Sequence, residues 1–270
     1  MPLALYFALN SSRRAEKFLG IVCLVSVGII LPATMSRAAW IAAVVGTLPV
    51  IILYITSQRY NSKIIKNSKN VTIAIVVSGA LFVGFMYGLY SFKKNSAEGR
   101  LLIWRVSATL VSEKPLTGSG LGSFLVLYDG AQADYFLSGK ASPKQHTIAD
   151  SPEYTFNEYV QITVEHGIIG LLLFLGIVFS IFASKVTPVA NKSLVFAIKG
   201  SLLAFLVFAF FSYPFSILSL TILFVVLIAM LASQLQPIEY LKTTRFKFGS
   251  IFLFNFSFIH FLYCLFMVRR

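Results

Sequence analysis

Two arginines stand at the boundary between apolar and polar sequence. Arg37 lies in the stretch LPATMSRAAWIAA between two apolar runs, and Arg100 opens the stretch RLLIWR. A charge flanked by membrane-type sequence usually faces a cavity or a partner, although an arginine at the membrane surface can also extend its side chain to water. Two guanidinium groups together grip phosphate oxygens in a fork geometry. We therefore predict that Arg37 and Arg100 meet at the outer membrane surface and bind an anionic head group, a pyrophosphate in particular.

The stretch TFNEYVQITVEHGIIGLLLF begins polar and becomes almost wholly apolar without an obvious break. On a helix, Asn157, Gln161 and Glu165 are spaced four residues apart, with Glu158 beside them, so these side chains form one polar stripe. Polar groups inside a membrane need partners within the protein. We predict that the stripe points towards the same cavity as the arginines and orients sugar hydroxyls; the alternative is a stripe that water solvates outside the membrane.

The amino-acid composition indicates the environment, water or lipid, in which these residues lie. The 270 residues are 57% hydrophobic and 12% charged, with a mean hydropathy of +0.80. A soluble domain of this size cannot bury so much apolar surface, so we predict an integral membrane protein. The two cysteines and three histidines are scattered, and we expect neither a disulfide, nor a metal site, nor a cofactor.

Apolar windows long enough to cross a bilayer predict an all-α polytopic protein with six or seven transmembrane helices. These windows are residues 18–35, 38–57, 71–91, 167–184, 194–212, 215–233 and, less clearly, 249–267. The formal charge of +13 is explained by basic residues in the loops expected on the cytoplasmic side, and it does not indicate a nucleic-acid surface. The basic loop from Arg59 to Lys69 is expected in the cytoplasm. Segment 92–158 then lies outside, between N-terminal (1–91) and C-terminal (159–270) membrane regions.

The outside segment should contain short helices. Residues 100–112 have helical spacing, and Pro115 with the glycines at 118, 120 and 122 should end that helix and form turns. The same Gly-Ser-Gly-Leu-Gly run could offer backbone N–H groups to a phosphate, although it lacks the lysine of a P-loop. Both readings, packing turn and phosphate cradle, stay open at this point.

Three motifs in order, TMSRAAW, GRLLIWRVSATLVSEKPLTGSGLGSF and FNEYVQITVEHGIIGLLLF, resemble those of the O-antigen ligase and polymerase-related family of bacterial membrane proteins. The resemblance covers roughly residues 30–185. It implies an enzyme of the bacterial inner membrane, with the large loop in the periplasm. Its partners would be a glycan donor on undecaprenyl pyrophosphate and a glycan or lipid-core acceptor, and it would need no metal or nucleotide.

The resemblance also assigns roles to residues. Arg37 and Arg100 would neutralise the leaving pyrophosphate, in agreement with the electrostatic argument. With Arg100 we expect the substrate to contact Trp104, Arg105, Asn157, Gln161 and Glu165. Where the ligases carry the histidine proposed as general base, this chain has Phe156.

Another group must then take the proton if the chain is active. The nearby candidates are Glu153, Glu158 and His146, and we choose Glu158, because a carboxylate can act as general base when its pKa suits the working pH. Family members have around a dozen spans, so the chain is expected to correspond to the C-terminal half of a longer protein.

Two further functions stay open. A small-solute transporter would carry polar groups near the bilayer midplane, and only Lys199, Asn255 and His260 fit that pattern. A non-catalytic protein that only binds the lipid-linked glycan would explain Phe156 and the short chain. Sequence alone does not separate a ligase from a repeat-unit polymerase, because both use the same donor.

Overall fold

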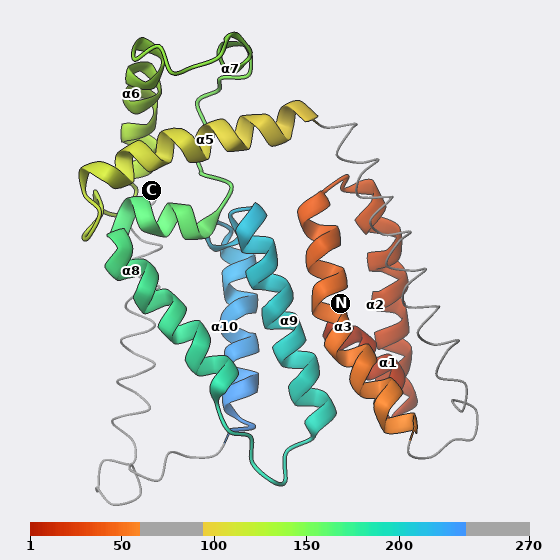
Figure 1. Ribbon diagram of the computed structural model, residues 1–270. Helices are drawn as coiled ribbons and strands as arrows, with labels where there is room; N and C mark the ends of the chain where they lie inside the picture. Colours follow the sequence, from red (N-terminus) through yellow and green to blue (C-terminus); the bar gives the residue numbers. More distant parts are fainter. Residues whose placement is uncertain (60–93, 236–270) are drawn as a thin grey trace, which may run out of the picture.

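The computed structural model describes residues 1–59 and 94–235, and these residues are almost entirely helical (Figure 1). In chain order the helices are α1 (Pro2–Asn10), α2 (Arg14–Ala33), α3 (Arg37–Arg59), α5 (Lys94–Glu113), α6 (Ser123–Leu137), α7 (Pro143–Thr147), α8 (Glu158–Ala183), α9 (Lys192–Phe211), the short 3₁₀ helix η2 (Pro214–Ser216) and α10 (Leu218–Ala232). Helices α1 to α3 stand beside α8 to α10, and α5 lies across one end of both groups with α6 and α7 beyond it (Figure 1). The α8–α9 connection lies at the opposite end.

Among the residues that the structure describes, four helices are long and apolar enough to cross a membrane. They are α2, α3 over Arg37–Tyr54, α8 and α9, and they match the predicted spans 18–35, 38–57, 167–184 and 194–212. The predicted span 215–233 is a shorter helix, since η2 occupies its start and α10 has 15 residues. The predicted spans 71–91 and 249–267 lie outside the described residues.

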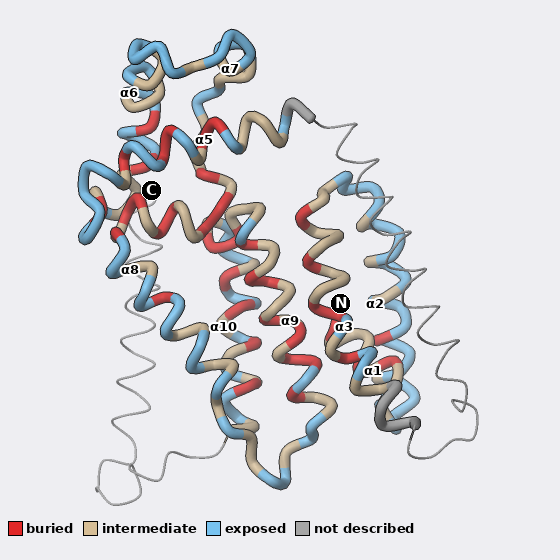
Figure 2. The backbone as a smooth tube through the Cα atoms, in the orientation of Figure 1, coloured by how far each residue is buried: buried red, intermediate tan, exposed pale blue. Residues whose placement is uncertain are grey.

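The surfaces of these helices suit a hydrocarbon environment. Only 6% of the apolar window of α2 and 11% of that of α8 is buried within the protein, and Figure 2 shows α2 exposed along most of its length. Phe18 and Ile29 on α2 are 66% and 70% exposed. A water-soluble protein rarely exposes apolar surface on this scale, so the membrane character predicted from composition is confirmed.

Small residues allow α3 and α9 to pack closely. A Cβ atom added to Gly46 would lie 2.5 Å from the Ala204 Cβ and 2.6 Å from the Gly200 carbonyl oxygen. Gly200 faces Gly46 in the same way. Such contacts between small residues are the usual basis of helix association in lipid, where burial of apolar surface contributes little. This packing joins the N-terminal and C-terminal helices.

Helix α8 does not run unbroken into the membrane, as its sequence suggested. Gly167 has φ 67° and ψ −172°, which is not helical, and it separates residues 158–166 from the apolar remainder of α8. The first part lies roughly crosswise at the end of the bundle, and the second descends beside α10 and α9 (Figure 1). The prediction of one continuous helix was therefore wrong, whereas the predicted start of the span at residue 167 coincides with the kink.

The loop after α5 fills the kink. The amide groups of Ile168 and Ile169 donate to the carbonyl oxygens of Pro115 and Leu116, at 2.8 and 3.3 Å. In return, the amides of Ser119 and Gly120 each donate at 2.9 Å to carbonyls near the end of the first part of α8, those of Val164 and Glu165. These two glycine-loop amides are thus used within the protein, which favours the packing role over the phosphate cradle.

Gly167 should tolerate no larger residue. A Cβ atom there would clash with the Leu116 carbonyl, and a left-handed backbone costs an L-residue about 1–2 kcal/mol in addition. We expect Gly167→Ala to lower the free energy of unfolding by at least about 2 kcal/mol. The decrease would appear as a lower melting temperature of the detergent-solubilised protein.

Gly176, on the membrane part of the same helix, gives the control. A Cβ atom at Gly176 would meet nothing within 4 Å, and alanine is the better helix former. Gly176→Ala should therefore leave the melting temperature unchanged or slightly raised. Equal losses in the two variants would contradict the role given to the kink.

Candidate functional site

Arg100 lies in the second turn of α5, above the ends of α8 and α9, and is half-buried. Its Nη1 donates a 2.7 Å hydrogen bond to the carbonyl oxygen of Phe211, the last residue of α9. Its guanidinium carbon lies 5.0 Å from the ring centroid of Phe156, within the range of a cation–π contact. One guanidinium group thus joins α5 to the end of α9 and to the segment before α8.

The charge of Arg37 acts on Arg100, and the predicted anion site formed by the two arginines stays a prediction. The pKa of Arg100 is lowered, first by burial and next by the positive charge of Arg37, while Tyr213 acts in the opposite direction. Arg37 is half-buried and begins α3, where the Ser36 hydroxyl accepts a hydrogen bond from the Ala39 amide at 3.3 Å. Two cations beside the N-terminus of a helix form surroundings that favour a bound anion.

Phe156 holds an unusual backbone conformation at this site. Its φ is 54°, which is rare for a bulky side chain and marks local strain. The ring lies between the Arg100 guanidinium and Tyr213, whose ring centroid is 5.3 Å away. Phe156 thus contacts Arg100 through its aromatic face.

Tyr213 is a site residue that the sequence reasoning missed. It stands in the turn between α9 and η2 and stacks on Tyr154, with centroids 4.5 Å apart and planes at 15°. The predicted spans 194–212 and 215–233 leave residues 213 and 214 only as a turn between them. A tyrosine in a turn on the same side as the polar loop was a possible signal, but its proximity to Arg100 arises only in three dimensions.

The predicted polar stripe is buried inside the protein. Asn157, Glu158, Gln161 and Glu165 are 2–5% exposed, so the alternative of a water-solvated stripe is wrong. Gln161 Nε2 donates to Glu165 Oε1 at 2.6 Å, and Gln161 Oε1 accepts from the Thr155 amide at 3.0 Å. These bonds tie the stripe to the segment that carries Phe156.

Glu158 forms an anchor for a neighbouring turn. Its Oε1 accepts a 2.7 Å hydrogen bond from the Phe215 amide in η2, and the side chain is 2% exposed. Arg100 holds the Phe211 carbonyl on the other side of the same turn. The two residues assigned to chemistry therefore fix both ends of segment 211–215, at whose centre lies Tyr213.

The other predicted site residues lie at varying distances from this centre. Trp104 faces it, because its Nε1 donates to the Thr155 carbonyl at 2.9 Å and its ring contacts Phe210. Arg105 is exposed on α5; five positions after Arg100, it points about 140° away around the helix. His146, considered as a base, is exposed on α7 against Phe136. Among the described residues no cluster of His, Cys, Asp or Glu could hold a metal.

Asn157 has a structural role. Its Oδ1 accepts hydrogen bonds from the amides of Tyr159 and Val160, at 3.0 and 3.2 Å, which is N-capping of α8. A direct contact with substrate stays a prediction for this residue.

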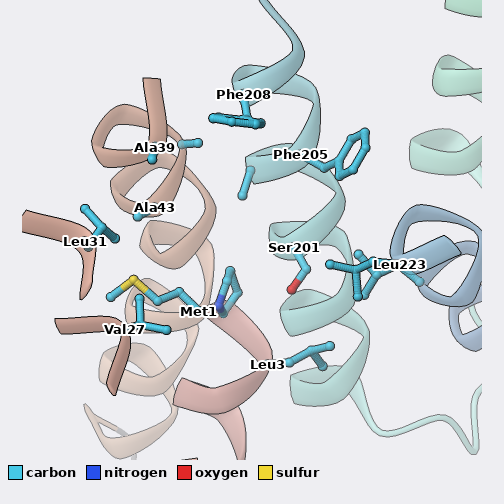
Figure 3. A pocket seen from close by; sticks show the side chains of 14 residues that line it. Met1, Leu3, Val27, Leu31, Ala39, Ala43, Ser201, Phe205, Phe208 and Leu223 are labelled. Carbon is cyan, nitrogen blue, oxygen red and sulfur yellow. The ribbon is translucent and has the colours of Figure 1, made fainter. Parts of the chain in front are cut away.

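An apolar pocket of about 320 Å³ lies away from these polar groups, between the two helix groups (Figure 3). Side chains from α1, α2, α3, α9 and α10 line it, among them Leu31, Phe205 and Phe208. The hydroxyl of Ser201 also reaches it, and Ala39 lines it two residues beyond Arg37. This pocket suits a hydrocarbon chain and not polar chemistry.

Comparison with known proteins supports the family that the sequence motifs resemble. The sequence model of the O-antigen ligase family matches residues 19–175. This region contains Arg37, Arg100, Phe156 and Glu158, and it ends within α8.

Curated relatives agree with the family match. A provisionally named polysaccharide ligase of Rickettsia conorii is 36% identical over 106 residues, which is 38% of this chain and 24% of the relative. One from Rickettsia bellii is 29% identical over 120 residues, or 44% of this chain and 27% of the relative. One from Rickettsia typhi is 36% identical over 92 residues, or 33% and 21%. The chain therefore aligns with only a part of each relative.

The cap at Asn157 can be tested by stability. We expect Asn157→Ala to lower the free energy of unfolding by about 1 kcal/mol, since two amides at the start of α8 lose their acceptor. Asn157→Ser keeps a capping oxygen and should retain most of the stability. Thermal unfolding in detergent measures both, and equal melting temperatures for the Ala variant and the parent chain would contradict the capping role.

Proposed function

Because the chain belongs to the O-antigen ligase family, we propose that it transfers a glycan from undecaprenyl pyrophosphate to an acceptor sugar. The reaction takes place on the periplasmic side of the bacterial inner membrane, at the end of the bundle where α5 lies. The acceptor is another glycan chain or a lipid core, which leaves ligase and repeat-unit polymerase as the two forms of the same activity.

The paired arginines are the observation that carries this proposal. Arg37 and Arg100 lie close enough for the charge of one to lower the pKa of the other. Two neighbouring guanidinium groups repel each other, and an anion bound between them offsets that repulsion. A diphosphate supplies oxygens for both and retains negative charge as the leaving group. The apolar pocket between the two helix groups suits the prenyl chain of such a donor.

The transfer itself is a substitution at the anomeric carbon of the donor sugar. The oxygen of an acceptor hydroxyl forms the new glycosidic bond, and the bond from the carbon to the diphosphate oxygen breaks with its electron pair on that oxygen. The two guanidinium groups stabilise the charge that develops on the diphosphate. The proton of the acceptor hydroxyl must pass to a base.

Glu158 is the general base that the sequence suggested. Its geometry also supports a structural role as the anchor of the turn after α9. Its carboxylate accepts the Phe215 amide and is almost fully buried. An anchored carboxylate of this kind holds a backbone turn in place. One pair of substitutions separates the anchor from the base.

Glu158→Gln keeps an oxygen that can accept the Phe215 amide, whereas Glu158→Leu leaves that buried amide without its partner. We expect the Leu variant to lose about 1–3 kcal/mol of stability and the Gln variant to fold normally and keep most of its transfer. Membrane levels, melting temperature and surface glycan measure the two effects. If the Gln variant folds but transfers no glycan, the carboxylate is the base and not only an anchor.

Non-catalytic binding of the lipid-linked glycan is the second candidate. Phe156 favours it, because no ring nitrogen is available at that position and its face contacts Arg100. A binding protein would hold the donor without consuming it. The purified protein therefore separates the two candidates: product formed from donor and acceptor supports the enzyme, and donor binding without product supports the binding protein.

The arginines are tested in cells whose surface glycan depends on this protein. We expect Arg37→Ala and Arg100→Ala each to lower mature glycan at least about tenfold while the undecaprenyl-linked donor accumulates, since a charge-assisted contact with the leaving group is lost. Replacement by Lys should restore only part of the activity, because Lys lacks the fork of donors.

Arg13→Ala is the matched control. Arg13 carries the same charge, is exposed, and pairs with Glu16 on the surface. Equal membrane levels of all variants must be shown by immunoblot. Normal glycan in Arg37→Ala and Arg100→Ala cells would refute the donor site.

A further inference from the structure

The turn between α9 and α10 presents a tyrosine hydroxyl that makes no hydrogen bond among the residues described. Tyr213 is half-buried. One ring contact is the stack on Tyr154, and the other is the edge contact with Phe156 at 5.3 Å and 75°. Because these two rings hold the aromatic body, the polar tip of Tyr213 is the part of the side chain that can bind another molecule.

The backbone that carries Tyr213 is fixed on both sides. The Phe211 carbonyl accepts from Arg100 at 2.7 Å, and the Phe215 amide donates to Glu158 at 2.7 Å. Two charge-assisted hydrogen bonds therefore bracket a turn of five residues. Such a bracket orders a side chain at the centre of the turn before substrate arrives, which is what a binding group requires.

The surroundings of Tyr213 indicate what its hydroxyl binds. Tyr213 and the Arg100 guanidinium both contact the ring of Phe156, at 5.3 and 5.0 Å from its centroid. The charge of Arg37 acts on the same guanidinium group. All three side chains carry N–H or O–H donors, so their common ligand is an anion. A phenol contributes a hydrogen bond without a third positive charge, at a place where the two guanidinium groups already repel each other.

We propose that Tyr213 is a substrate-binding residue whose phenolic hydroxyl donates a hydrogen bond to a phosphate oxygen of the diphosphate bound by Arg37 and Arg100. This assignment rests on the proposed function, because it adds a third donor to the same donor site. Tyr213 lies beyond residues 19–175, where the match to the family ends, so the assignment comes from the geometry of this chain.

The test is binding of farnesyl diphosphate, a short prenyl diphosphate, to the full detergent-solubilised chain. Tyr213→Phe removes one oxygen atom and keeps the contacts with Tyr154 and Phe156, so the variant should fold. We expect its dissociation constant for farnesyl diphosphate to rise about tenfold, since a hydrogen bond to a charged group is lost. Binding of farnesol, which has the same prenyl chain without the diphosphate, should be unchanged.

Tyr135→Phe is the matched control, because Tyr135 lies on α6 against Phe136 and outside the site. It should bind farnesyl diphosphate as the parent chain does. If Tyr213→Phe weakens farnesol and farnesyl diphosphate equally, the residue only supports the packing and the proposal is overturned.

Arg100→Ala, measured in the same assay, separates the proposed diphosphate site from the proposed role of the Tyr213 hydroxyl. If Arg100→Ala loses binding and Tyr213→Phe does not, the hydroxyl is not a ligand, and the arginine site stands. If neither variant changes the affinity, the donor site itself is refuted, and the role of Tyr213 falls with it.

Discussion

The arrangement of the site depends on one close approach between two backbones. At Gly167 the chain of α8 leaves its helical path, and the loop after α5 enters the gap so closely that a single Cβ atom would not fit. Hydrogen bonds run in both directions across this contact. As a result the helix that carries Arg100 is held at a fixed distance from the first part of α8.

From this fixed contact the polar groups form a connected set in which structural and chemical roles overlap. Arg100 and Glu158 were selected from the sequence as chemical groups, yet both hold the backbone of the turn after α9. Their substitution therefore changes the position of Tyr213 as well as their own charges. For this reason the Gln and Lys variants are more informative than alanine variants, which remove both roles together.

Four of the membrane spans could be predicted from the sequence, and the details that orient the site could not. Hydropathy alone locates α2, α3 and α9, because each is a long uninterrupted apolar segment. Gly167 lies in a similarly apolar segment, and a glycine there is compatible with either a straight or a kinked helix. The partner of Glu158 is 57 positions away in the sequence, and the positive φ of Phe156 results from tertiary contacts that overrule the preference of a bulky residue. The local sequence pattern therefore predicts neither the contact of Glu158 with Phe215 nor the backbone conformation of Phe156.

The shortness of α10 has a consequence for the bilayer around the protein. A helix of 15 residues is about 22 Å long, whereas the hydrocarbon core is about 30 Å thick. Local thinning of the bilayer beside α10 is one way in which a membrane accommodates so short a span. Because α10 starts directly after the turn that bears Tyr213, such a depression on that side would bring the polar headgroup layer towards the arginines. A lipid-borne diphosphate would have a shorter distance to travel out of its own leaflet there than beside the longer α2 or α9.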